Sequence, residues 1–514
     1  MPPEARAASC APTRFDRVAE TLAERATPLF VKELRQALRG RYLKVTLSIA
    51  VALTTLAAVI VLGIVVPLKI DELRAYAGVI LFGATFGATA FVATFFVPFA
   101  AFSSMNAEAD ENTLEFLQLS NLSPLAIASG KLVSASLQAA LVCATAMPFA
   151  VVAWHMGGIP PSLLVLAPLF TMIGAACFSA IAIALSTLSR VRWVRIVLMV
   201  LFGFFLFNVG QYMLFLGAVA GAAVFLPGAG GMLSGAMTFG VSAVAALGFL
   251  AVALAFAANM LAHREESGST PLRRVTSILA LLGAIATLLV TLAGSGGAEA
   301  VGLATTALVV TFPALAWCCT EAEALPLGPR ARPPRPGLSG WLALPHLAGG
   351  GRGALLATLT CVGIGLAGAL GAALARGGWS EDASRPLGVA AYAWLYLLLP
   401  SVVFSPWSGR TAVRALARVG VFAFPWVAFL GTSLLKALIT GPTPDAFENP
   451  ANPFHMLSRL DARGAPVGLG GWAVLGFFLL LTLALNAWRM ARGVLEVRRA
   501  MRARDARERP EAAV

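Results

Sequence analysis

Long apolar runs separated by short polar segments dominate the chain. A membrane-spanning helix needs about 20 apolar residues, because the hydrocarbon core is about 30 Å thick and an α-helix rises about 1.5 Å per residue. About twelve runs reach this length. They cover residues 45–68, 77–103, 132–156, 162–188, 195–218, 236–262, 277–294, 300–318, 353–375, 387–406, 417–438 and 470–489. The pattern predicts an all-α, polytopic transmembrane helical bundle of about 12 spans.

Composition supports the same fold class. The 514 residues are 58% hydrophobic and 12% charged, and the mean hydropathy is +0.81. A soluble protein has about 25% charged residues, so the polar residues here are too few to cover a water-facing surface. We therefore expect a multi-pass membrane protein.

The distribution of basic residues predicts the orientation. With the N-terminus in the cytoplasm, 31 of the 38 Lys and Arg residues lie in cytoplasmic segments, as the positive-inside rule requires. A miscounted span would invert every later segment, so this split favours two cytoplasmic termini. The net charge of +13 is then explained by cytoplasmic loops and anionic headgroups. No basic patch is interleaved with aromatic residues, so no nucleic-acid partner is expected.

The polar breaks suggest a domain organisation. The longest central break, HREESGSTPLRR, begins at His263, after the sixth predicted span. We find no clear repeat between the halves, so a six-plus-six arrangement is a hypothesis. The predicted regions are a cytoplasmic and interfacial region (1–44), a six-helix region (45–262) with a polar segment at 104–131, a linker (263–276), a second six-helix region (277–489) and a basic cytoplasmic tail (490–514).

The segment before the first span has helical amphipathic spacing. In TPLFVKELRQALRGRYLK, from Thr27, the leucines favour one face and charged residues occupy much of the rest. This predicts a helix lying among the headgroups; the alternative is a plain cytosolic flank of the first span. The charged residues of the predicted interfacial helix are Lys32, Glu33, Arg35, Arg39 and Arg41.

The spans contain few chemically active groups. All Asp and Glu residues fall outside the predicted spans or at their ends, which argues against an ion-coupled carrier with a buried carboxylate. Asn208, Gln211 and Tyr212 are candidates for a transport pathway; like Asn486, they can instead hydrogen-bond a neighbouring helix. No P-loop, HExxH or GxSxG motif occurs, so we expect no catalytic residue, metal or cofactor in this chain. The six cysteines are interpreted as small core residues.

The segment at 104–131 differs from an ordinary loop. From Ala109 it reads ADENTLEFLQLSNLSPLAIASGKL. Thr113 can cap a helical turn, Ser123 and Pro124 form turns, and Lys131 is expected at the membrane surface. Its other notable residues are the carboxylates Glu108, Asp110, Glu111 and Glu115 and the apolar Leu114, Phe116, Leu117 and Leu119. This pattern predicts a short amphipathic helix partly exposed to a partner.

Two motifs resemble those of ABC-2-type transporter permeases. NTLEFLQLSNLSPLAIASGKL is similar to the first cytoplasmic loop of that family, with departures at Asn112 and Asn121. TPLFVKELRQALRGR is similar to its NPxxxKELRxxxR opening, with Thr27 in place of Asn. Together the motifs cover about 100 residues; spans seven to twelve carry no such motif, whereas the family usually has six spans.

The resemblance implies a permease subunit, in the bacterial inner membrane, of an exporter driven by a separate ATP-binding cassette ATPase. That ATPase would dock on the 104–131 loop, with Glu108, Glu111 and Glu115 facing its basic residues and the apolar residues as anchors. A second copy of the chain or a second permease subunit is a further expected partner. The alternatives are a membrane scaffold that does not transport, a secondary carrier, or a loop that folds onto the chain's own basic tail.

Overall fold

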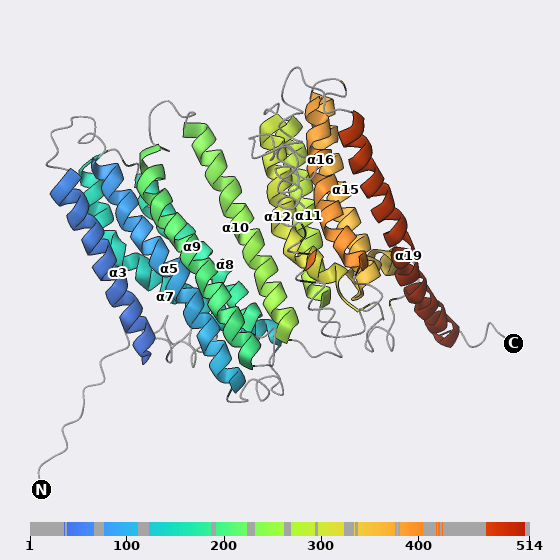
Figure 1. The fold of residues 1–514 in the computed structure, drawn as a ribbon, viewed down its shortest axis with the longest axis horizontal. Helices are drawn as coiled ribbons and strands as arrows, with labels where there is room; N and C mark the ends of the chain where they lie inside the picture. Colours follow the sequence, from blue (N-terminus) through green and yellow to red (C-terminus); the bar gives the residue numbers. More distant parts are fainter. Residues whose placement is uncertain are drawn as a thin grey trace, which may run out of the picture. The chain divides into compact units, whose positions relative to one another are not determined.

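The computed structural model describes residues 35, 39–65, 77–110, 123–157, 159, 161–186, 192–223, 232–261, 269–292, 297–322, 334, 338–375, 378, 381–403, 418, 420–421, 424 and 469–508. Every regular element in these ranges is helical (Figure 1). In chain order they are α3 (Arg41–Ile60), η1 (Val61–Val65), α5 (Ala77–Asp110), α7 (Pro124–His155), α8 (Pro161–Ser186), α9 (Arg192–Ala223), α10 (Met232–Leu261), α11 (Ser269–Leu292), α12 (Gly297–Cys319), α14 (Leu338–Ala343), η2 (Leu344–His346), α15 (Gly350–Ala375), α16 (Glu381–Val403) and α19 (Leu469–Glu508).

The first of two compact units covers residues Met1–Ala236. Helix α5 packs against α3, α7, α8 and α9. Small residues such as Ala93, Ala135 and Ala139 are fully or almost fully buried where α5 meets α7, which allows the helix backbones to approach closely. Against α9, α5 presents a row of phenylalanines, of which Phe91 and Phe95 contact Phe207 edge-on.

The second unit covers residues Met237–Val514 and has its own core. Helix α15 packs against α11, α12, α16 and α19, and α10 contributes to a cluster with α11 and α12. Gly368 of α15 lies so close to α16 that an added Cβ would fall 2.6 Å from Pro386 Cβ. Close approach of backbones at small residues therefore shapes this unit as well.

The all-α, multi-pass architecture predicted from the hydropathy pattern is confirmed. Ten helices in the described part are long and apolar enough to cross a membrane, and each overlaps a predicted span. The fifth predicted span corresponds to α9, whose described apolar stretch is Arg195–Gln211. The eleventh, 417–438, lies outside the described residues apart from 418, 420–421 and 424. The total of 12 spans and the cytoplasmic termini remain predictions.

Several helices extend well beyond the apolar runs. Helix α5 continues to Asp110, α7 already begins at Pro124, and α19 has 40 residues and continues to Glu508. Hydropathy marks only the lipid-facing part of a helix, whereas Ala, Glu, Met and Arg have high helix propensity and continue it into water. The residues at 490–508 are therefore a helical extension of the last span.

Two boundaries differ from the expected regions. The compact units divide between Ala236 and Met237, inside α10, and α11 begins at Ser269, within the segment expected as a linker. Near the N-terminus, Arg35 and Arg39 are helical and exposed, and Gly40 is extended (φ −63°, ψ 140°). Arg41 then begins α3, the first candidate span. Lys32 and Glu33 of the predicted interfacial helix lie outside the described residues.

Candidate functional site

The flanks of the acidic segment are described, but its centre, 111–122, is not. The predicted roles of the central residues therefore stay predictions. These residues are Glu111, Thr113, Leu114, Glu115, Phe116, Leu117 and Leu119. The described flanks are the end of α5, with Glu108 and Asp110, and the start of α7, with Ser123, Pro124 and Lys131.

Ser123 and Pro124 define the start of α7. The Ser123 hydroxyl accepts a hydrogen bond from the Ala126 backbone N–H at 3.2 Å, and Pro124 is the first helical residue. A serine N-cap satisfies an otherwise unpaired amide, and proline at the first position has no N–H to satisfy. The serine and proline expected to form a turn therefore end the acidic segment by starting a helix.

Glu108 and Lys131 join α5 to α7. The Lys131 Nζ donates to Glu108 Oε1 at 2.8 Å, and the two side chains are only 3% and 16% exposed, with Lys131 the more buried. Lys131 is buried within the first unit, and its expected position at the membrane surface stays a prediction. A buried ammonium is costly without a partner, so the carboxylate on α5 accounts for its position.

Asp110 and Arg195 join α5 to α9. Their ion pair is asymmetric, because the Arg195 side chain is 8% exposed and that of Asp110 is 48% exposed. The last turn of α5 therefore holds two carboxylates directed to cations on two different helices. The acidic segment is fixed to three helices at its α5 edge, and two of its carboxylates pair within the chain.

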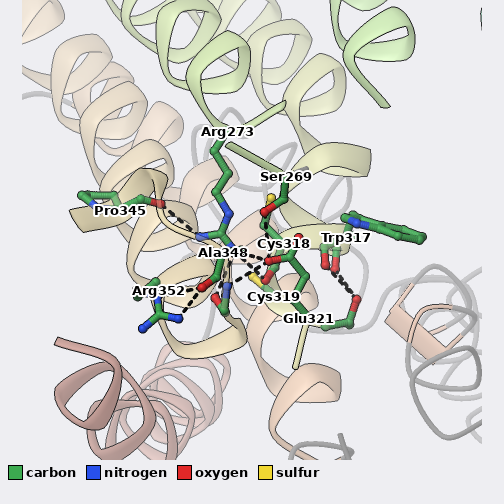
Figure 2. Close-up of polar contacts among 12 residues, drawn as sticks. Ser269, Arg273, Trp317, Cys318, Cys319, Glu321, Pro345, Ala348 and Arg352 are labelled. Carbon is green, nitrogen blue, oxygen red and sulfur yellow. Dashed lines mark hydrogen bonds and ion pairs between the residues drawn. The ribbon is translucent and has the colours of Figure 1, made fainter. Parts of the chain in front are cut away.

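The second unit contains a buried charge cluster that the sequence did not reveal (Figure 2). Arg273 of α11 is fully buried. Its Nη2 donates to Glu321 Oε2 at 2.7 Å, to the Gly349 carbonyl at 3.0 Å and to the Cys318 carbonyl at 3.3 Å. Its Nη1 donates to the Pro345 carbonyl at 3.0 Å. One guanidinium therefore joins α11, the end of α12 and the segment around η2.

Glu321 is the counterpart of Arg273. Its Oε2 also accepts from the Ser269 hydroxyl at 3.3 Å and from the Gly349 backbone N–H at 3.0 Å. Gly349 has φ +142°, a region that side-chain-bearing residues rarely adopt, and an added Cβ would collide with the Arg352 guanidinium. Residues 344–352, which we call the junction segment, are therefore fixed by a carboxylate and a glycine.

Two more buried arginines connect α19 to this cluster. Arg352, 1% exposed, donates to the Ala348 carbonyl (Nε, 3.0 Å), the Gly493 carbonyl (Nη1, 3.3 Å) and Glu496 (Nη1, 3.4 Å). Arg489 of α19 donates to the Cys319 carbonyl at 3.2 Å and to Ser401 of α16 at 3.2 Å. The positive-inside count placed these arginines at span ends, but no periodicity indicated that they are buried.

Asn486 and the cysteines behave as the sequence suggested. The Asn486 amide is fully buried and donates to the Leu398 carbonyl of α16 at 3.4 Å, which confirms a hydrogen bond to a neighbouring helix. Five described cysteines are buried, and those at 318 and 319 supply backbone carbonyls to the arginines. Outside the spans, burial and the nearby positive charges of Arg274 and Arg273 lower the pKa of His346 below its usual value.

The candidate pathway residues lie on α9. The Asn208 side chain is exposed and donates to the Phe204 carbonyl of its own helix at 2.7 Å, and Gln211 is also exposed. Tyr212 is helical, and its side chain lies outside the described residues. Their role in transport stays a prediction.

No family model matches the chain, and no curated protein matches it. Any functional conclusion therefore depends on the two sequence motifs and on the geometry around them.

Proposed function

We propose that the chain is the permease subunit of an ATP-binding cassette exporter of the bacterial inner membrane, and that a separate ATPase subunit docks on the acidic segment at 104–131. The proposal combines the resemblance of this segment to a permease coupling loop with the way its edges are held. The observation that carries it is the attachment of the end of α5 to both α7 and α9 through Glu108 and Asp110.

The length of α5 supports the proposal. Its 34 residues extend about 51 Å at about 1.5 Å per residue, whereas a bilayer with headgroups is about 40–45 Å thick. A helix of this length is long enough to carry its acidic end beyond the headgroups. With the orientation predicted from the basic residues, this end would reach the cytoplasm, where an ATPase operates.

The two ion pairs reduce the number of carboxylates that we propose for ATPase docking. Glu108 and Asp110 pair with cations of this chain, so the carboxylates offered to an ATPase are those of Glu111 and Glu115. The apolar anchors remain Leu114, Phe116, Leu117 and Leu119.

The same pairs provide a route for motion. A displacement of the docked segment moves α5 and α7 through the chain itself, and it moves α9 through Asp110 and Arg195. Because α5 also packs against α3 and α8, closure of the ATPase would reach every described spanning helix of the first unit. This is the property that a coupling loop requires.

Reversal of Glu111 and Glu115 to Lys tests the proposal. We expect the double variant to insert normally and to lose co-purification with the cassette ATPase in mild detergent, because an acidic helix can no longer meet a basic cleft. Asp71→Lys with Glu72→Lys, in a predicted outer segment, is the control with the same charge change, and it should retain the ATPase. Unchanged co-purification of the first variant would contradict the docking role. If the wild-type chain binds the ATPase but does not change its rate of ATP hydrolysis, the chain is a scaffold.

A further inference from the structure

The two halves of α19 are held in different ways. The membrane half is fixed by Asn486 and Arg489, whose buried side chains bond to α12 and α16. Residues 493–508 continue the same helix beyond the predicted span at 470–489. We call residues 493–508 the strap.

The described contacts join the strap to the junction segment through Arg352 and Leu347. Arg352 donates to its Gly493 carbonyl and to Glu496, at 3.3 and 3.4 Å. Val497 and Met501 are buried and pack with Leu347. Glu496 is 34% exposed, so water and salt reach the one carboxylate of this contact.

Gly493 of α19 lies against Gly351 and Arg352 at the start of α15. An added Cβ would sit 3.2 Å from Arg352 Cγ and 3.4 Å from its backbone nitrogen. Glycine therefore permits the contact, and a glycine inside a helix also weakens the helix at that point. Gly493, the weak point of the helix, is therefore also the boundary between the membrane half of α19 and the strap.

Exposed arginines weaken the helix of the strap. Arg498, Arg499 and Arg502 are exposed, and the first and last of these are four residues apart, where like charges destabilise a helix. Arg352, in contrast, keeps its bonds to the Ala348 carbonyl whether or not the strap is present. Detachment of the strap would therefore leave this buried guanidinium bonded.

The strap packs on the junction segment, which lies at the centre of the buried charge cluster. Leu347 and Arg352 belong to the junction segment, and between them Gly349 bonds to Arg273 and to Glu321. The docked strap thus covers the segment that joins the ends of α11, α12 and α15. We propose that the strap is a detachable brace of this junction, held by Arg352, and that its release loosens the inner end of the second unit. This device is independent of the proposed transport function.

Hydrogen exchange of the full-length protein in nanodiscs tests the proposal, with Glu496→Gln compared to the exposed-face control Arg499→Gln. We expect Glu496→Gln to exchange about three- to tenfold faster in the strap, because a partly exposed charge-assisted hydrogen bond is weakened. The backbone amides of Gly349 and Gly350 should accelerate with it. The control and the membrane half of α19 should exchange like the wild type.

The salt bridge and the apolar packing of the strap can be tested separately, the first by raising the salt concentration and the second by Val497→Ser. An increase from 0.1 to 1 M salt shortens the Debye length from about 10 to about 3 Å. It should accelerate the wild-type strap but not the strap of Glu496→Gln, because in that variant salt screens only the repulsion among the exposed arginines. Val497→Ser should accelerate the strap through lost apolar packing and keep the salt response.

Three results would overturn the proposal. The strap does not detach separately if it exchanges at the same rate as the membrane half in every variant. The salt bridge does not hold it if Glu496→Gln matches Arg499→Gln. The strap does not brace the junction if it accelerates while the Gly349 and Gly350 amides stay protected.

Discussion

Lys131 of α7 and Glu108 of α5 form a buried ion pair, 2.8 Å between Nζ and Oε1, at the two edges of the acidic segment. Within this segment, α5 ends at Asp110, two residues after Glu108, and α7 begins at Pro124, seven residues before Lys131. The pair therefore closes the segment at its base. It also gives an internal partner to Glu108, which the resemblance to ABC-2-type permeases implied would face an ATPase.

Loss of this pair should be costly. Glu108→Gln leaves the buried ammonium of Lys131 without this carboxylate, and breaking a buried pair destabilises a protein by about 3–5 kcal/mol. Thermal unfolding in detergent should show a clear fall for Glu108→Gln and for Lys131→Met. The control is Lys44→Met, which removes an exposed lysine and should change little. Equal stability of all three variants would show that the pair contributes nothing.

Asp110 and Arg195 should respond asymmetrically. Asp110→Asn leaves a buried guanidinium with a weaker acceptor, a loss of about 1–3 kcal/mol. Arg195→Met leaves a half-exposed carboxylate that water can solvate, so the loss should stay below about 1 kcal/mol. Unfolding midpoints of the two variants measure the difference. A larger loss of stability in Arg195→Met than in Asp110→Asn would mean that the contribution of the pair does not come from the burial of Arg195.

Gly349 should not tolerate a side chain. Gly349→Ala forces φ +142° on alanine and places its Cβ against the Arg352 guanidinium, so we expect a loss of at least about 1–3 kcal/mol. Gly363→Ala in α15 is the matched control, because no atom lies within 4 Å of its added Cβ. That variant should be neutral or slightly more stable, since alanine favours a helix. Similar unfolding of both variants would contradict the fixed junction segment.

The sequence predicted those features of the fold that depend on hydropathy or on neighbouring residues. The spans follow from apolar length, and the start of α7 follows from Ser123 and Pro124. The burial of Arg273 and Arg352 had no such signal. Arg273 bonds to Glu321 and to the Gly349 carbonyl, which are distant from it in sequence. Arg352 bonds to the equally distant Gly493 carbonyl. Charge counting placed these arginines at the ends of spans, but a buried charge is explained only by the three-dimensional arrangement of its partners.

His346 gives the second unit a pH-dependent stability. Burial lowers the pKa of His346 most, and the positive charges of Arg274 and Arg273 lower it further. The imidazole therefore binds a proton more readily in the unfolded chain than in the folded one. Stability should therefore be highest with the neutral imidazole and fall as the pH drops below about 6.5. His346→Gln should remove this part of the pH dependence in unfolding scans between about pH 5 and 8. A slope identical to wild type would exclude His346 as its source.

The side of the membrane that carries the acidic segment decides the functional proposal. Five described cysteines are buried and Cys10 can be replaced by Ser, so a cysteine introduced at Asn112 becomes the reporter. A membrane-impermeant maleimide should label Asn112→Cys in inside-out vesicles and not in intact cells, because 31 of 38 basic residues fall on the same side as this segment in the predicted topology. Asp71→Cys, in a predicted outer segment, should show the opposite pattern. Labelling of Asn112→Cys in intact cells would place the acidic segment where no cytoplasmic ATPase can bind it.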